Sequence, residues 1–172
     1  MTVQTTLTDV DRARDIASGV ADPELPMVTL HDLGILRDVG HDGDTLVVTI
    51  TPTYSGCPAM ATIRADLEVA LRRGGFDRVD VRTSLSPAWT TDWISDDGRR
   101  KLDEHGISPP HKGSGHRDGP IPLTLIRPDR LLQCPRCGAE DTDETSRFGS
   151  TACKSLHRCR QCGEPFEHVK EI

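Results

Sequence analysis

Apolar residues recur at helical spacing near the start of the chain. Val10, Ala13, Ile16 and Ala17 follow one another at intervals that place them on one face of a helix. Thr8 and Asp11 stand in the spacing of a capping box, with Asp in place of the usual Glu. We therefore predict a helix that begins after Thr8 and ends before Pro23, because proline ends a helical pattern.

Two β-prone runs follow, Ile35–Val39 and Thr45–Thr51. The residues between them, Gly40–Asp44, are typical of a turn, so the two runs predict a β-hairpin. After Pro52 the apolar spacing becomes helical again, which predicts a second helix from about Pro58 to Arg73.

A third strand is predicted at Val79–Leu85, where apolar and polar residues alternate. Gly74 and Gly75 separate it from the helix before it and favour a helix stop there. The order helix, hairpin, helix, strand is typical of a small α+β domain. The predicted fold class is therefore α+β, with a C-terminal cysteine module described below.

The hydrophobic pattern weakens between Ser86 and Pro128. One short helix is predicted from about Ser95 to His105, closed by Gly106. The next stretch, 108–120, has almost no apolar residue and is typical of a linker. We therefore divide the chain into an α+β domain with a Trp-containing extension (1–107), a linker (108–130) and a cysteine module (131–172).

Composition indicates a thin core, since six of the 172 residues are aromatic while Gly and Pro number 15 and 12. A bound metal would help such a chain to fold. The net charge is −6 and no segment is basic, which argues against a nucleic-acid partner. No apolar run approaches the length of a membrane span, and Met1–Asp11 lacks the features of a signal peptide. These observations predict a cytoplasmic protein without a membrane partner.

Two C-x-x-C-G motifs are the strongest chemical signal in the sequence. They contain Cys134 and Cys137, then Cys159 and Cys162, with 21 residues between the pairs. Two cysteines three positions apart can present both thiolates to one ion, and the glycine lets the backbone turn around the sulfurs. We predict a structural zinc site of four cysteines. A single iron, a small iron–sulfur cluster and metal-free reduced cysteines are the alternatives, since these ligands also suit iron.

The cysteine module contains further candidate groups. Cys153 is left over by the four-ligand count and is interpreted as a buried thiol, a swapped ligand or a reactive thiol helped by Lys154. His157 and His168 are interpreted as solvated or packing residues, with entry into a mixed metal site as the alternative.

Cys57 lies between a predicted strand and a predicted helix. With Pro58 at the first helical position, Cys57 would be the N-cap, where the positive helix end favours the thiolate. A functional thiol and a buried structural cysteine remain the two interpretations. The acidic turn of Asp22 and Glu24 is expected to face the same end of the sheet and to offer oxygen ligands to iron.

Trp89 and Trp93 are the only tryptophans and lie in a polar, weakly patterned segment. They either anchor that segment on its own core or dock a partner, because tryptophan is enriched in interface hot spots. Arg99–Lys101 is interpreted as a solvated helix face. Solvated roles are also expected for the histidines of this region, His105, His111 and His116.

The motifs Asp22–Met27, Leu30–Ile35 and Thr51–Pro58 resemble those of the iron–sulfur assembly family that includes the SufT-type maturation factors. The resemblance covers about residues 8–85. It implies an α+β domain that serves cluster assembly on client proteins and handles iron or a cluster transiently. It also implies that Cys57, Asp22 and Glu24 are the functional positions.

Further motifs resemble the D-subunit family of the bacterial phenylacetyl-CoA epoxidase, a multicomponent monooxygenase. They are Ser86–Ile94, Gly106–Pro110, Phe148–Lys154 and Glu164–Phe166. The resemblance spans nearly the whole chain and implies a di-iron oxygenase subunit and an iron–sulfur flavin reductase as partners. Ser155 and His157 depart from the family pattern, in which Ala and Tyr are expected.

The chain itself carries neither a four-helix di-iron ligand set nor a G-x-G-x-x-G nucleotide motif. We therefore predict a noncatalytic accessory subunit that assists iron–sulfur or di-iron centre assembly in its partners. A general iron–sulfur assembly factor and a pathway enzyme with Cys57 as nucleophile are the alternatives. His31 is the only histidine near these motifs that could serve such an enzyme as a base.

Overall fold

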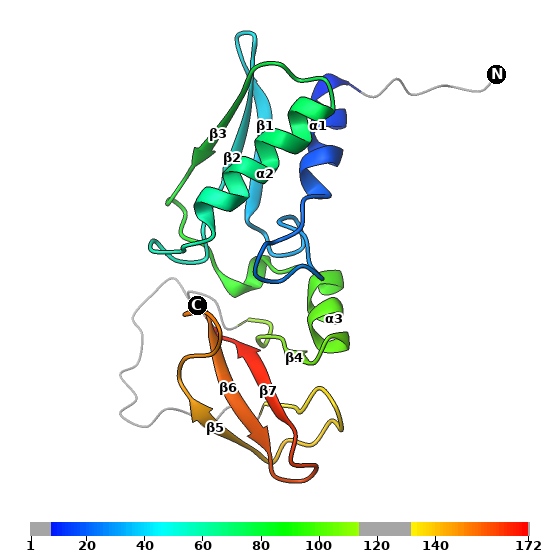
Figure 1. Cartoon of the computed structure of the whole chain (residues 1–172), viewed down its shortest axis with the longest axis vertical. Helices are drawn as coiled ribbons and strands as arrows, with labels where there is room; N and C mark the ends of the chain where they lie inside the picture. The colour runs from blue at the N-terminus through cyan, green and yellow to red at the C-terminus, as the bar shows by residue number, and fades with distance from the viewer. Residues whose placement is uncertain (1–7, 114–131, 172) are drawn as a thin grey trace, which may run out of the picture. The chain divides into compact units, whose positions relative to one another are not determined.

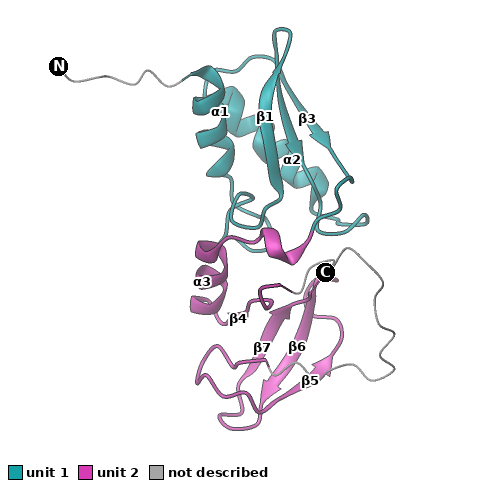
Figure 2. Cartoon of the chain, turned by 180° about the vertical axis from the view of Figure 1, so that it is seen from behind, with its two compact units in different colours: residues 1–89 teal, residues 90–172 magenta. Residues whose placement is uncertain are grey.

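The computed structural model describes residues 8–113 and 132–171 of the chain (Figure 1). The chain divides into two compact units, residues 1–89 and 90–172 (Figure 2). Each unit has its own sheet, of three strands in the first and four in the second. The predicted α+β class is confirmed.

The first unit contains the predicted helix, hairpin, helix and strand in that order. Its elements are α1 (Asp9–Ser18), β1 (Leu36–Asp42), β2 (Thr45–Ile50), α2 (Met60–Arg73) and β3 (Val79–Thr83). The capping box is confirmed: the Thr8 side chain accepts a hydrogen bond from the Asp11 amide, and the Asp11 carboxylate accepts one from the Thr8 amide. The hairpin turn is tighter than predicted, because β1 continues through Gly40 to Asp42 and pairs there with Thr45.

Helices α1 and α2 supply the apolar layer that covers the sheet. Strand β2 is central, antiparallel to β1 and parallel to β3, and its side chains alternate between buried and half-buried as a one-sided sheet requires. The large aliphatic side chains that are fully buried in this unit come from both layers and from the loop before β1: Val28, Leu30, Leu46, Val48, Ile50, Ile63, Leu67, Leu71 and Val81.

Strand pairing brings three loops to one end of this sheet. Ile50, the last residue of β2, pairs with Leu36 at the start of β1 and with Thr83 at the end of β3. The loops 19–35, 51–59 and 84–89 therefore leave the sheet at the same end. This arrangement positions the candidate residues of the first unit.

The second unit combines a short helical segment with the cysteine-containing sheet. It contains the 3-10 turn η1 (Thr91–Trp93), α3 (Asp96–Glu104), β4 (Ile107–Ser108), β5 (Thr142–Ser146), β6 (Lys154–Cys159) and β7 (Pro165–Val169). The predicted helix from Ser95 to His105 is confirmed, with the Ser95 side chain as N-terminal cap and Gly106 at φ +79° after the last turn. The strand order is β4-β7-β6-β5.

The chain next to the expected linker, 108–130, takes part in the cysteine-containing sheet, and the division into domains stays a prediction. Ile107 and Ser108 form a parallel pair with Glu167 and His168 of β7, so they extend the cysteine-containing sheet. The segment 90–107, which the sequence assigns to the first domain, belongs to the second unit. A strand of two residues leaves no alternating pattern, so hydrophobic periodicity could not reveal it. Most of the expected linker, residues 114–130 with His116, lies outside the described residues.

Arg99 is a correction to the predicted solvated helix face. It is only 9 % exposed, and its guanidinium donates to the carbonyl of Thr91 at 2.6 Å and to that of Pro110. Burial lowers the pKa of this guanidinium, against the opposite pull of Asp92 and Asp96. The side chain turns inward because the segments on both sides of α3 present carbonyls that need donors. Arg100, by contrast, is exposed as expected.

No helix in the two described stretches, 8–113 and 132–171, has the length and apolar character needed to cross a membrane.

Candidate metal centre and thiol site

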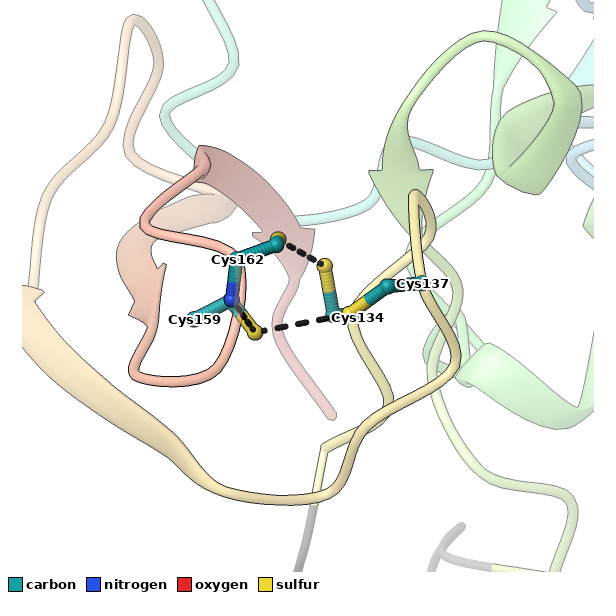
Figure 3. Close-up of side chains that lie close together, drawn as sticks. All are labelled: Cys134, Cys137, Cys159 and Cys162. Carbon is teal, nitrogen blue, oxygen red and sulfur yellow. Dashed lines mark hydrogen bonds between the residues drawn. The ribbon is translucent and has the colours of Figure 1, made fainter.

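The four cysteines of the two C-x-x-C-G motifs converge on one point (Figure 3). Their sulfur atoms all lie within 4.8 Å of one another. The Sγ atoms of Cys134 and Cys162 are 3.8 Å apart, and those of Cys137 and Cys159 are 3.6 Å apart. The predicted cluster of Cys134, Cys137, Cys159 and Cys162 is therefore present in the fold.

Each motif reaches this geometry through the same backbone turn. The amide of Gly138 donates to the carbonyl of Cys134 at 2.8 Å, and that of Gly163 donates to the carbonyl of Cys159 at 3.0 Å. Both glycines have positive φ, +72° and +78°, which residues with a side chain rarely adopt. The motif therefore needs glycine after its second cysteine to aim both sulfurs at one centre.

The spacing of the sulfurs fits a tetrahedral metal ion. A zinc–sulfur bond of about 2.3 Å in a regular tetrahedron places the sulfurs roughly 3.8 Å apart. The two separations given above agree with that value, and the remaining pairs of sulfurs lie within 4.8 Å. Four thiolates also fill all four positions, so a metal held here has no open coordination site for a substrate. The donor set indicates metal binding with a structural role and suits zinc or iron.

The sulfurs influence one another's ionisation. The Cys162 amide and, to a smaller extent, the Gln161 amide lower the pKa of the Cys159 thiol to about 7, while burial opposes them. The Ala139 amide favours the thiolate of Cys137, but burial and hydrogen bonds with the other three sulfurs raise its pKa to about 12. The Cys159 thiol thus ionises readily while the Cys137 thiol resists ionisation, and a cation at the centre would offset the repulsion among four thiolates.

The ligands also form the apolar centre of this end of the module. Cys134, Cys159 and Phe166 make one buried cluster, with Ala139 packed against it. Two of its three buried members are candidate metal ligands. Metal binding and packing are therefore the same event at this position.

Cys153 lies outside the four-cysteine group. It is half-buried, and its Sγ lies 3.0 Å from the Thr151 hydroxyl oxygen. Lys154, the residue proposed to help this thiol, directs its Nζ to Glu167 at 2.8 Å. The structure thus favours the packing interpretation of Cys153 over the swapped ligand, and reactivity stays a prediction.

His157 and His168 have the packing roles that the sequence allows for. Each is 6 % exposed; the His157 ring stacks on Phe166 and meets His168 edge to face. Burial lowers the pKa of His157, and it lowers that of His168 to about 4 even though the Ser108 carbonyl opposes the shift. Ser155 and His157, the two residues that depart from the family pattern, contact each other. The Ser155 hydroxyl lies 2.9 Å from Nε2 of His157.

Cys57 does not cap helix α2, which corrects the sequence-based expectation. The helix begins at Met60 with Ala59 as N-cap, so Pro58 is not its first residue. The Cys57 amide donates to the carbonyl of Tyr54 at 3.2 Å, and its own carbonyl accepts from the Met60 amide at 3.4 Å. An extra turn thus separates Cys57 from the helix and weakens the argument from the helix dipole. The residue remains half-buried in the loop at the sheet end.

Asp22 and Glu24 lie in the loop 19–35, at the same end of the sheet as Cys57, as the sequence suggests. Asp22 is 6 % exposed, and its Oδ1 accepts hydrogen bonds from the amides of Glu24 and Leu25, both at 2.9 Å. Glu24 is half-buried. Among the described residues, these two carboxylates and Cys57 do not form a group of three that could hold a metal. Asp22 therefore forms a turn, and its service as an oxygen ligand stays a prediction.

The two tryptophans differ. Trp89 is 5 % exposed, and its Nε1 donates to the Leu33 carbonyl at 2.8 Å, so it anchors its segment on the core of the first unit. A ring this buried does not offer a surface for docking a partner, which corrects that interpretation of Trp89. Trp93 is half-buried in η1, and docking stays a prediction for it.

The ion pair of the buried Lys154 and the half-buried Glu167 was not expected from the sequence. The two strands β6 and β7 are antiparallel, with Lys154 opposite Val169 and Leu156 opposite Glu167. The sequence predicts no strand in this module, so it offers no signal for a pair of residues that only strand pairing brings together.

Two family models match the chain. Residues 11–82 match the model described as an iron–sulfur cluster assembly protein, and residues 119–170 match the PaaD zinc beta ribbon domain. A protein of Escherichia coli (strain K12), provisionally named as the D subunit of 1,2-phenylacetyl-CoA epoxidase, is 45% identical over 157 residues, which cover 91% of this chain and 90% of that protein. The chain belongs to the phenylacetyl-CoA epoxidase D-subunit family.

Solved structures resemble the first half of this D-subunit family member. A domain of unknown function, DUF59, from Bacillus anthracis superposes with a TM-score of 0.50 at 27% identity, covering 54% of this chain and 90% of that one. A conserved hypothetical protein from Thermotoga maritima covers 59% of this chain and 98% of its own, at 28% identity and a TM-score of 0.45. The former likeness supports the α+β fold of the first unit.

Proposed function

We propose that this chain is a noncatalytic accessory subunit of a phenylacetyl-CoA epoxidase that assists the assembly of an iron–sulfur or di-iron centre in partner subunits. The observation that carries the proposal is the relative of the epoxidase D-subunit family, which matches nearly the full length of both chains. The match of residues 11–82 to an iron–sulfur cluster assembly protein supports assembly as the task.

The cargo of this function, iron or a cluster, needs a thiol that can take it up and release it. Cys57 suits that task, because it is half-buried in an open loop and lies outside the four-cysteine group. Asp22 assists indirectly by holding its loop in shape through two amide hydrogen bonds. Glu24, in the same loop, is the proposed acidic neighbour of the transfer site.

The ribbon metal is proposed to be zinc with a structural role. A closed four-thiolate site that shares its ligands with the apolar cluster supports this assignment. The proposed partners are the di-iron oxygenase subunit and the iron–sulfur flavin reductase of the epoxidase. The cytoplasm is the proposed location, as for the complex that the chain serves.

The test compares two cysteine variants in cells that depend on this protein. A strain lacking the chain is complemented with wild type, Cys57→Ser or Cys153→Ser and grown on phenylacetate. The matched control is Cys153→Ser, because it removes a half-buried thiol outside the ligand group. We expect Cys57→Ser to abolish growth and to leave the purified reductase or di-iron protein poor in iron, while the control grows normally.

Three other results would change the proposal. Normal growth and fully metallated partners with Cys57→Ser would remove the assembly role of this thiol. Loss of activity in unrelated iron–sulfur enzymes of the same cells would favour a general assembly factor. Fully metallated partners that are inactive together would mean that the chain acts as a component of the working complex.

A further inference from the structure

Phe148 is the most exposed of the large apolar side chains in the described part of the chain. Its exposure is 66 %, against 61 % for Leu85 and 44 % for Val69. It lies in the loop Arg147–Cys153, between β5 and β6 of the ribbon. The chain has three phenylalanines and few other large aromatic residues for its core, yet one of the three is exposed to solvent.

The backbone around Phe148 is fixed by hydrogen bonds on both sides. The Ser146 hydroxyl donates to the Phe148 carbonyl at 2.9 Å and accepts from its amide at 3.2 Å. The next amide, of Gly149, donates to the Lys154 carbonyl at 2.8 Å. The exposed ring therefore stands on a loop with a defined conformation.

An ion pair between the buried Lys154 and the half-buried Glu167 holds the rest of this loop. The Nζ of Lys154 lies 2.8 Å from Glu167, and the same carboxylate accepts from the Ser150 amide at 2.9 Å. A Cβ on Gly149 would lie 2.8 Å from that carboxylate, so a larger residue there would require the Glu167 side chain to shift. The ion pair and the Ser150 hydrogen bond together favour the loop arrangement that presents Phe148.

Positive charge lies beside the ring. The Nζ of Lys170 is 4.4 Å from the centre of the Phe148 ring and donates to the Ala152 carbonyl at 2.8 Å. The neighbouring Arg147 is 62 % exposed, and its contact with Glu144 is long, 3.8 Å. The other nearby carboxylate, Glu167, is already paired with Lys154. The three cations Arg147, Lys154 and Lys170 outnumber the two carboxylates Glu144 and Glu167 by one, so the charge near the ring is net positive.

We propose that the loop 147–153 is a docking loop, in which Phe148 enters an apolar pocket rimmed by carboxylates on another subunit of the epoxidase. The inference rests on the proposed function for the identity of that subunit. Phenylalanine supplies a large apolar contact, and a loop that is already ordered loses little entropy on binding. Lys170 and Arg147 select the acidic rim and set its orientation.

The test measures binding of the full-length protein to the purified di-iron oxygenase subunits and to the purified reductase, each immobilised separately. We expect Phe148→Ala to weaken binding to one of them at least tenfold, as for a central contact residue. Lys170→Glu should also weaken it, with a reduced salt dependence of association. The matched controls are Leu85→Ala, a similarly exposed apolar residue of the first unit, and Arg73→Glu, an exposed cation of α2.

The outcomes separate this proposal from the proposed function. Binding of neither partner by the wild type would refute both, whereas normal binding by Phe148→Ala would refute the docking loop alone. Loss of self-association in Phe148→Ala, measured by sedimentation, would mean that the ring serves a second copy of this chain. A fall in thermal stability with unchanged binding would mean that it packs within the chain, and either result overturns the proposal.

In cells, the two sites are distinguished by protein level. Phe148→Ala should lower the iron content of the partner when the chain is scarce, and overproduction should restore it because binding is only weakened. Cys57→Ser should bind normally and should not be rescued by overproduction. The docking loop is contradicted if Phe148→Ala binds its partner normally in vitro and overproduction restores the partner's iron content with neither variant.

Discussion

Replacement of Cys134 by serine tests the link between the metal and the fold of the second unit. The change removes one of four sulfurs and substitutes a hydroxyl, which is a poor ligand for zinc. It also alters one of the three buried members of the apolar cluster, which pack with Ala139. We expect the variant to lose its metal and the ribbon to unfold.

The magnitudes favour unfolding over local damage. Zinc binding contributes about 10–16 kcal/mol in isolated zinc-finger peptides at pH 7. Complete burial of Phe166, the one cluster member that is not a ligand, contributes only about 2–3 kcal/mol. Without the metal, two buried thiols and one phenylalanine cannot hold the two knuckles together.

The assay combines metal analysis with hydrogen exchange followed by mass spectrometry. Wild-type protein should contain one zinc per chain, and Cys134→Ser should contain much less. Peptides from 132–171 should lose protection from exchange, and so should Ile107 and Ser108, because their strand β4 pairs with β7. Residues 8–89 should keep their protection, since they form a separate unit.

The control is Cys153→Ser, which changes a cysteine of the same module outside the ligand group. It should retain zinc and normal exchange. The reasoning is refuted if Cys134→Ser exchanges as slowly as wild type after its metal has been lost. Absence of both zinc and iron from the wild-type protein would refute the metal site itself.

Three further results are expected. Trp89→Phe should cost about 1–3 kcal/mol of unfolding free energy, measured by urea denaturation of the full-length chain, because the Leu33 carbonyl loses its buried donor. Trp93→Phe should cost less in the same assay. The folded-state pKa of His168, about 4, lies below its usual value of 6.5. The unfolded chain therefore binds this proton first, and the free energy of unfolding should fall by ~3 kcal/mol as pH drops from about 6.5 to 4. His168→Asn should remove this pH dependence of stability in denaturation experiments. Asp22→Asn should preserve the iron content of the partner subunits because it keeps the Oδ1 acceptor, whereas Asp22→Ala should lower the melting temperature in calorimetry. Low partner iron with Asp22→Asn would instead indicate that Asp22 is a ligand.

The parts of the fold that follow from local chemistry were predictable. Helix α1 begins at its capping box, and the four cysteines meet because each pair is only three residues apart and is followed by glycine. The N-terminus of α2 was predicted wrongly because Pro58 is favourable at a first helical position but also in the turn that it occupies.

The parts that depend on tertiary contacts were not predictable. The inward turn of Arg99 depends on carbonyls of Thr91 and Pro110, eight and eleven residues away, which no periodicity reveals. Likewise, the two-residue strand β4 is defined only by its partner β7, some sixty residues later. Charged residues at such positions look solvated in sequence because the groups that pair with them are contributed by other segments.

The two groups of cysteines differ in a way that assigns them different tasks. In the ribbon, four sulfurs lie within 4.8 Å of one another and would fill every coordination position of a bound ion. Two of these cysteines also pack with Phe166, so release of the ion would unfold the apolar cluster that they form. Cys57 lies half-buried in the loop between β2 and α2, outside the four-cysteine group, and we propose that a ligand there can bind and leave without loss of the core. Transfer of iron or a cluster requires such reversible binding. An assembly role for this chain therefore depends on the first unit, and the ribbon metal should remain bound throughout the cycle.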